Sequence, residues 1–204
     1  MRMGPTTSRR ALVGAAAVAL VVGVVAGCSG SGAKPGPAAT TASSTPTASP
    51  SPTASPTPDA SVKPVRPAAM DQVNAAGAEA VAVYFLNLYP YVYASNDLTE
   101  WKALSHAECV FCASVTSHVG EQVAAGTQSE GGLVAISTVR STVINPGRWW
   151  SVDLELTQAT SSTVDGAGKV VEDFPEVKAY KMNLAVVYEA EHWVVRELSY
   201  TRTS

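Results

Sequence analysis

The sequence lacks several features that identify common classes of protein. It has only three cysteines in 204 residues, so the fold does not depend on many disulfides. It contains no G-x-S-x-G nucleophile motif and no glycine-rich phosphate loop, so it lacks the signatures of α/β-hydrolases and of nucleotide-binding loops. The apolar stretch 11–26 has 16 residues, fewer than the roughly 20 that a membrane-spanning helix needs. Motifs therefore predict no catalytic residue, no cofactor and no spanning helix.

The N-terminal residues instead have the pattern of an exported lipoprotein. Three arginines and no acid come before the apolar stretch 11–26. Val25-Ala26-Gly27 supplies the aliphatic and small residues that the lipoprotein signal peptidase requires, and the thiol of Cys28 is the acceptor for the lipid. We predict a signal peptide over 1–27, a lipidated Cys28 carrying acyl chains such as palmitate, and a membrane anchor on the extracytoplasmic face. Arg9-Arg10 leaves open whether export uses the general secretory or the twin-arginine route.

The composition changes over residues 28–69, which form a predicted linker. This segment holds nine of the thirteen prolines, set among repeated Ser-Pro units, and it has no aromatic residue. Such a composition does not bury enough apolar surface to offset chain entropy, so we predict disorder. Proline stiffens the chain toward polyproline II, which gives a stalk reaching on the order of 100 Å. Its serines and threonines leave O-glycosylation open.

Residues 70–204 have the size of one ordinary domain. They number 135, enough for a single hydrophobic core. They contain 8 Lys and Arg against 16 Asp and Glu, a net charge of -8. A nucleic-acid partner needs a basic face, so this charge excludes nucleic acid as the expected partner.

The first half of this domain has helical periodicity. Apolar residues recur every three or four positions from Val73 to Val92, which predicts a long helix that begins near Asp71. Pro90 lies inside the pattern and predicts a kink or a break. Asn96-Asp97 is expected to end this helix and to cap a short second one over 98–105. A third helix is predicted from Cys109 to Ala125, before Gly126.

The second half has the two-residue period of β-strands. Asn145-Pro146-Gly147 and Asp165-Gly166-Ala167-Gly168 predict turns between strands. About four long antiparallel strands are expected, over 133–144, 149–159, 180–188 and 192–201. Helices followed by a meander define an α+β domain in which the N-terminal helices pack on an antiparallel sheet.

Cys109 and Cys112 are the two cysteines left for the domain. Residues three apart on a helix have Cα atoms about 5 Å apart, which suits a disulfide, and we predict one here. Two alternatives stay open. C-x-x-C spacing at a helix start also suits a redox couple, and His106 and His118 could complete a zinc site with the two cysteines. We favour the structural disulfide and expect no metal.

The order of elements resembles the nuclear transport factor 2-like cone, a cystatin-like fold in which a curved sheet wraps the first helix. More narrowly, the segments 91–97, 101–105 and 109–112 look like a family of actinobacterial lipoproteins of unknown function. The resemblance implies fold and location and brings no established activity. Cones of this type often dimerise through the sheet, so the resemblance also leaves a homodimer open.

Aromatic residues at helical or strand spacing are the candidate pocket or core residues. They are Tyr84, Trp150, Tyr180, Tyr188 and Trp193. Enzymes on the cone fold place a carboxylate base inside an apolar pocket. In this sequence Asp153 and Glu155 fall on the strand face opposite Trp150, so we expect no base inside.

We therefore expect a non-catalytic module at the cell envelope. It would bind an envelope protein, another envelope component or a small apolar ligand, and it would need no cofactor. One alternative is an enzyme of isomerase or hydratase type that uses the same cone; the other is the redox couple. An Asp, Glu or His lining a cavity is the observation that would favour the enzyme.

Overall fold

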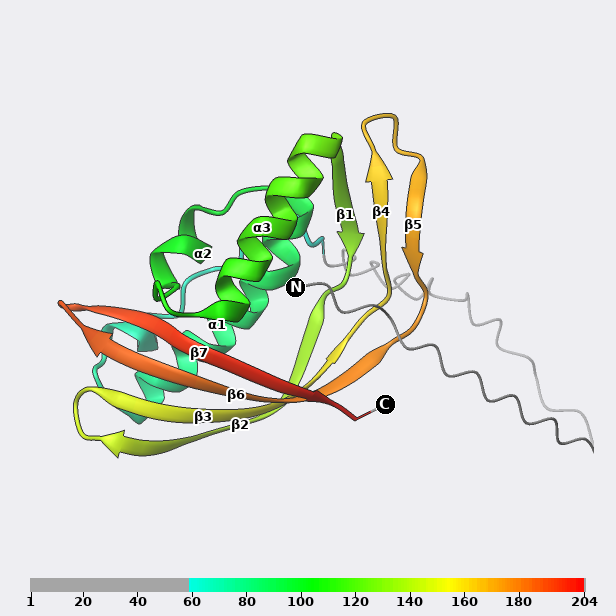
Figure 1. The fold of residues 1–204 in the computed structure, drawn as a ribbon. Helices are drawn as coiled ribbons and strands as arrows, with labels where there is room; N and C mark the ends of the chain where they lie inside the picture. The colour runs from blue at the N-terminus through cyan, green and yellow to red at the C-terminus, as the bar shows by residue number, and fades with distance from the viewer. Residues whose placement is uncertain (1–58, 204) are drawn as a thin grey trace, which may run out of the picture. The chain divides into compact units, whose positions relative to one another are not determined.

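A computed structural model describes residues 59–203 (Figure 1). A short 3-10 turn, η1 (Ala68–Asp71), comes before three helices, α1 (Ala75–Ser95), α2 (Thr99–Leu104) and α3 (Val110–Ala125). Seven strands follow, β1 (Thr127–Gly131), β2 (Val134–Asn145), β3 (Trp149–Gln158), β4 (Ser161–Asp165), β5 (Val170–Phe174), β6 (Lys178–Glu189) and β7 (His192–Arg202). The fold therefore mixes helices with antiparallel sheet, as predicted. The predicted signal peptide, Cys28 and most of the linker lie outside the described residues.

The helix α1 begins later than we predicted and ends where we predicted. The side chain of Asn74 accepts a hydrogen bond from the Gly77 backbone N–H at 3.0 Å and caps its start, so Val73 lies before the helix and is exposed. At the other end Asn96 adopts a left-handed φ of 59°, which closes the helix as expected. The break considered at Pro90 is not found, because α1 runs through this buried proline.

The larger sheet has the strand order β2-β3-β6-β7 and is antiparallel throughout. Trp150, Val152, Leu154 and Leu156 of β3 are all buried, while Asp153 between them is exposed. The sequence alternation predicted this pattern. The buried face lies against α1, which contacts β2, β3 and β6. In Figure 1 the three helices lie on one side of this sheet.

Aromatic side chains fill the core between the helices and the larger sheet. The ring of Phe85 stacks on Trp101 with centroids 4.0 Å apart, and Trp150 lies 5.1 Å from Trp193. The indole Nε1 of Trp193 donates to the Met70 carbonyl at 2.8 Å, so the last strand is tied to η1. Each ring buries a large apolar surface, so this cluster supplies much of the fold's stability.

A second, smaller sheet has the order β1-β4-β5, and our sequence analysis missed it. We had placed only a turn at 165–168 between the strands 149–159 and 180–188, yet β4 and β5 pair there as a hairpin across that turn. β1 leads into β2, β3 into β4 and β5 into β6, so three chain segments cross from one sheet to the other. The strands β1, β4 and β5 lie side by side in the same order as β2, β3 and β6, the strands to which they are connected. The small sheet is therefore a bent continuation of the large one (Figure 1).

Two glycines make the bend between the sheets. Gly131 and Gly132 have φ values of 77° and 71°, a conformation that side chains disfavour. A Cβ on Gly131 would also lie 2.6 Å from the Thr160 carbonyl oxygen. Pairing continues across the bend, because the Gly132 N–H donates to the same Thr160 oxygen at 2.9 Å. Glycine at both positions therefore permits the curvature that leaves a hollow facing the helices.

Residues 59–69, which we assigned to the linker, make contacts with the domain. Ala60 is buried at 6% exposure, and the Lys63 ammonium lies 2.9 Å from the Glu100 carboxylate. The described domain therefore begins before the boundary that we predicted at residue 70.

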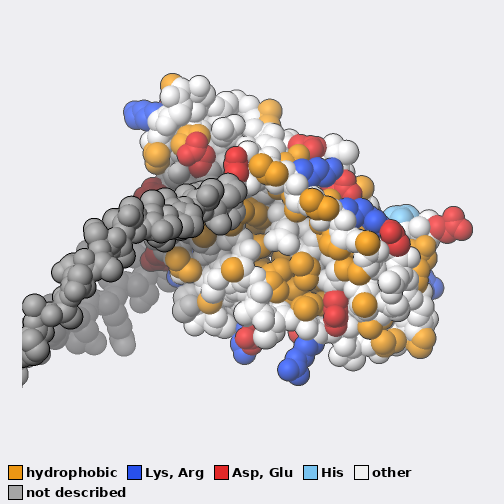
Figure 2. All heavy atoms as spheres, turned by 180° about the vertical axis from the view of Figure 1, so that it is seen from behind, with side chains coloured by type: hydrophobic (Ala, Val, Ile, Leu, Met, Phe, Trp, Pro, Cys, Tyr) orange, Lys and Arg blue, Asp and Glu red, His pale blue; other side chains and the backbone are white. Residues whose placement is uncertain are grey.

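The surface of the described domain carries both signs of charge. On the face in Figure 2, Lys and Arg side chains lie beside Asp and Glu side chains at the rim, and hydrophobic side chains gather toward the middle. Within residues 59–203, no helix is both long enough and apolar enough to cross a membrane.

Candidate ligand-binding site

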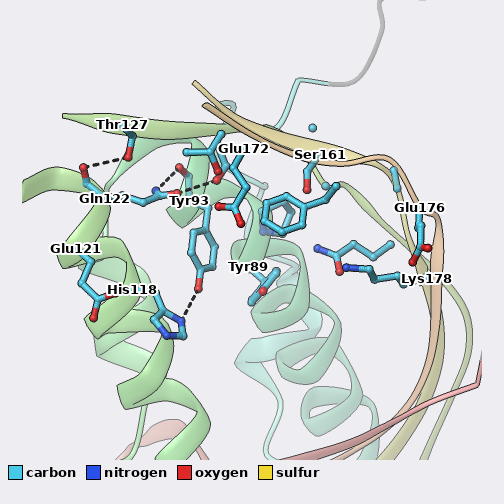
Figure 3. A pocket seen from close by; sticks show the side chains of 18 of the residues that line it. Tyr89, Tyr93, His118, Glu121, Gln122, Thr127, Ser161, Glu172, Glu176 and Lys178 are labelled. Carbon is cyan, nitrogen blue, oxygen red and sulfur yellow. Dashed lines mark hydrogen bonds between the residues drawn. The ribbon is translucent and has the colours of Figure 1, made fainter. Parts of the chain in front are cut away.

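A cavity of about 650 Å³ opens between the helices and the smaller sheet (Figure 3). One wall comes from the C-terminal half of α1 and from α3, and the other from β1, β4, β5 and the start of β6. Small-molecule sites are typically concave spaces of about 300–1,000 Å³, so this volume suits a small ligand.

The helical wall presents two tyrosines and a histidine. Tyr89 and Tyr93 lie one turn apart on α1, and both line the cavity. The Tyr93 hydroxyl lies 3.5 Å from Nδ1 of His118 on α3 (Figure 3). Gln122 donates from Nε2 to the Tyr93 carbonyl at 3.1 Å and accepts from the Ser129 hydroxyl at 2.8 Å. This glutamine joins α1, α3 and β1, so it fixes the wall that carries Tyr93.

The two tyrosines stay protonated in this wall. Burial raises the pKa of Tyr93, and the neighbouring Tyr89 raises it further. Burial also raises the pKa of Tyr89. Both side chains therefore offer neutral hydroxyls and flat rings to a ligand.

The sheet wall carries the charged groups. Glu172 and Phe174 come from β5, and Lys178 begins β6. The Lys178 ammonium lies 5.4 Å from the centroid of the Phe174 ring. Glu176, in the connection before β6, pairs with Arg202 at 3.0 Å. Glu172 has no ion-pair partner among residues 59–203.

An apolar recess of about 100 Å³ adjoins the cavity and shares Tyr89, Gln158 and Tyr180 with it. Its other lining residues are Leu86, Phe111, Val134, Leu156, Met182 and Tyr200. The recess lies over the hydrophobic core, since Leu86 and Leu156 belong to the core cluster. A ligand in the cavity therefore has a polar environment at one end and an apolar one at the other.

The five aromatic candidates divide between the core and this site. Tyr84, Trp150 and Trp193 are buried in the core, and Tyr188 packs against Trp193 with ring centroids 5.2 Å apart. Tyr180 lines both the cavity and the recess.

The cavity also contains acidic and basic groups that our sequence analysis did not place there. Glu121, Glu172, Glu176 and His118 line it, and all four are exposed. No charged side chain among residues 59–203 is buried. We missed these groups because they belong to the unpredicted small sheet, to the connection that follows it and to the exposed face of α3. The alternation of Glu172 and Phe174 around Asp173 was the available signal.

Cys109 and Cys112 form the predicted disulfide at the start of α3, with Cα atoms 5.2 Å apart. Both residues are 1% exposed. The indole Nε1 of Trp101 donates to the Cys112 carbonyl at 3.2 Å, so the bridged turn is tied to the aromatic core. Within the described part of the chain, no three His, Cys, Asp or Glu side chains come together in an arrangement that could hold a metal ion.

Comparison with known proteins gives a family. Residues 50–199 match the family of unknown function DUF6318, and the chain belongs to that family. The chain is similar in structure to the intermembrane space region of the chloroplast protein ARC6, with 13% identity, a TM-score of 0.49 and coverage of 65% of this chain and 99% of that one. It is also similar to an uncharacterised protein with a cystatin-like fold from Caulobacter vibrioides, with 10% identity, a TM-score of 0.40 and coverage of 63% and 91%. No curated protein matches the sequence.

Proposed function

We propose that this chain is a lipid-anchored, extracytoplasmic binding protein whose cavity takes a small molecule of the cell envelope. The observation that carries the proposal is the cavity of about 650 Å³, with aromatic rings on both walls and a carboxylate without an ion-pair partner among residues 59–203. Aromatic surface combined with a few placed polar groups is the usual composition of a small-molecule site.

The binding role is favoured over catalysis by the exposure of the charged groups. Enzymes on the cone fold hold their general base inside an apolar pocket, and Glu172 and His118 are both exposed. The enzyme alternative is supported by the presence of a carboxylate and an imidazole in the cavity. Under that alternative Glu172→Gln would abolish turnover of a bound molecule; under the binding role no turnover is measured with either protein.

The fold proposal is a nuclear transport factor 2-like cone. It is supported by α1 lying against the larger sheet and by the bend that continues this sheet into β1, β4 and β5. The binding site then corresponds to the open end of the cone.

The location proposal depends on Val25-Ala26-Gly27-Cys28. Lipidation at Cys28 would hold the domain at the membrane through acyl chains, each buried methylene contributing about 0.8 kcal/mol. Cys28→Ala should release the protein or block processing of its precursor, as measured by fractionation and intact mass. A mutant that is processed normally and stays in the membrane would contradict the anchor.

In-cell photocrosslinking tests the binding proposal. A photoreactive amino acid replaces Ala125, which lines the cavity, or Ala124, its exposed neighbour on α3 that does not. Mass spectrometry of the anchored protein should find a small-molecule adduct from position 125 and none from position 124. The same adducts from both positions, or none from position 125, would contradict a ligand in the cavity.

A further inference from the structure

The charge in the cavity is unbalanced. Among the acids of its lining, Glu176 is neutralised by Arg202 at 3.0 Å, whereas Glu121 and Glu172 have no ion pair within residues 59–203. Lys178 is the one Lys or Arg side chain of the lining. A concave surface with an excess of one sign concentrates the opposite charge, so this cavity favours a cation.

Glu172 is the carboxylate best placed to meet that cation. Figure 3 shows it extending from β5 into the cavity toward Tyr93, while Glu121 lies on α3 near His118. The faces of aromatic rings attract cations, and the cavity has such rings on both walls. Lys178 already demonstrates the effect, since its ammonium lies over the Phe174 ring of the same wall.

The apolar recess determines a second property of the ligand, the size of its apolar group. Its volume of about 100 Å³ is somewhat smaller than the roughly 150 Å³ engineered cavity that binds benzene, and it opens into the larger space. It therefore has room for one small apolar group, such as a phenyl ring or a branched alkyl group. Because Tyr89 and Tyr180 line both spaces, one molecule can occupy both.

We infer that the ligand carries a protonated amine and a small apolar group, with the amine at Glu172 and the apolar group in the recess. This inference rests on the proposed function, namely that the cavity binds a small molecule. It adds the chemical class of that molecule. An acidic ligand would use Lys178 instead, but the ammonium of Lys178 is held over Phe174 and its charge is outnumbered by Glu121 and Glu172.

Three probes of similar shape distinguish the effect of the ligand's charge on binding from the effect of its apolar group. They are 2-phenylethylamine, 2-phenylethanol and phenylacetate, which present a cation, a neutral hydroxyl and an anion on the same ring. Binding is measured by equilibrium dialysis against the full lipidated chain in nanodiscs, with the uptake of empty nanodiscs subtracted. We expect the amine to bind about tenfold more tightly than the alcohol, because hydrogen bonds to charged groups are the stronger ones. The anion should bind most weakly.

Two substitutions locate the amine. Glu172→Gln should reduce the affinity for 2-phenylethylamine to that for 2-phenylethanol and leave the alcohol unchanged. Asp173→Asn is the matched control, since it removes the same charge from the next position of β5, which is exposed and does not line the cavity. This control should keep the preference for the amine.

The outcomes separate the inference from the proposed function. Equal binding of all three probes, or preferred binding of phenylacetate, overturns the amine inference and leaves a small-molecule site in place. A preference for the amine that survives Glu172→Gln overturns the assignment to Glu172. Absence of binding for all three probes contradicts both the inference and the proposed function.

Discussion

The two sheets of this domain share three chain segments, to which the larger sheet adds β7, and they have opposite characters. In the larger sheet, β3 alternates buried apolar residues with exposed polar ones, and its apolar face covers α1. In the smaller sheet, every residue of β5 is exposed, and β1 has no buried residue. The larger sheet therefore supplies the hydrophobic core, whereas the smaller one presents side chains to the cavity. A bend at Gly131 and Gly132 is enough to convert one continuous structure into a core and a binding wall.

The largest expected difference between the sheets is in stability. Leu154→Ala removes a core side chain of β3 that is 2% exposed and should lower the free energy of unfolding by about 2–5 kcal/mol. Val171→Ala changes an apolar residue of β5 that is 53% exposed and should cost less than about 0.5 kcal/mol. Urea denaturation of both variants measures this difference. Similar losses would show that the smaller sheet is part of the core.

The disulfide should contribute less than the core residues of the larger sheet. It closes a very short loop, so reduction should lower the free energy of unfolding by about 2 kcal/mol in the chain-entropy model. Because both sulfurs are buried, a mild reductant followed by an alkylating agent should label neither cysteine of the folded protein. Rapid labelling under these conditions, detected by intact mass, would favour the redox alternative.

The turn that follows Tyr93 should contribute about 1 kcal/mol to the free energy of unfolding, and this contribution should depend on pH. Hydrogen bonds from Thr99, first its hydroxyl and then its backbone N–H, together with the Tyr91 hydroxyl, lower the pKa of Asp97 from 3.8 to about 2. A lowered pKa in the folded state means that the stabilisation is complete above about pH 4 and is lost as the pH falls through 2.

Asp97→Ala should therefore lower the free energy of unfolding by about 1 kcal/mol at pH 7. The difference in free energy of unfolding between the wild type and this variant should decrease as the pH is lowered from about 4 to about 2, as measured by urea denaturation at each pH. Asp173→Ala, an exposed aspartate of the smaller sheet, is the control and should show little effect. A difference in free energy of unfolding that does not change with pH would contradict the role given to the Asp97 carboxylate.

The contrast between the sheets also explains what the sequence could predict. Burial of one face imposes the alternation of Trp150, Val152 and Leu154, so the large strands and their turns were predicted nearly to the residue. The strand Ser161–Asp165 has a single buried residue, Val164, and every residue of Val170–Phe174 is exposed, so no alternation of buried and exposed residues marks these strands. Their pairing depends on the bend at Gly131 and Gly132, a tertiary feature that local patterns do not encode.

Local sequence patterns also did not predict which charged residues line the cavity. Tyr180 was identified from the sequence because it shares a strand face with buried residues. Glu172 and His118 line the same cavity only because the smaller sheet faces α3. The core aromatics Tyr84, Trp150 and Trp193 had the clearest periodicity and lie in the core rather than in the cavity. Regular patterns thus located the scaffold, and the binding residues followed from the fold.

Native mass spectrometry of the anchored protein, extracted from its own membranes, tests the central claim most directly. The wild type should carry a bound molecule that Ala125→Trp, which fills the cavity from α3, no longer retains. Ala124→Trp, which places the same ring on the exposed neighbour outside the cavity, should keep that molecule. Both variants retaining the molecule, or all three proteins emerging without one, would contradict a ligand-binding role for this cavity.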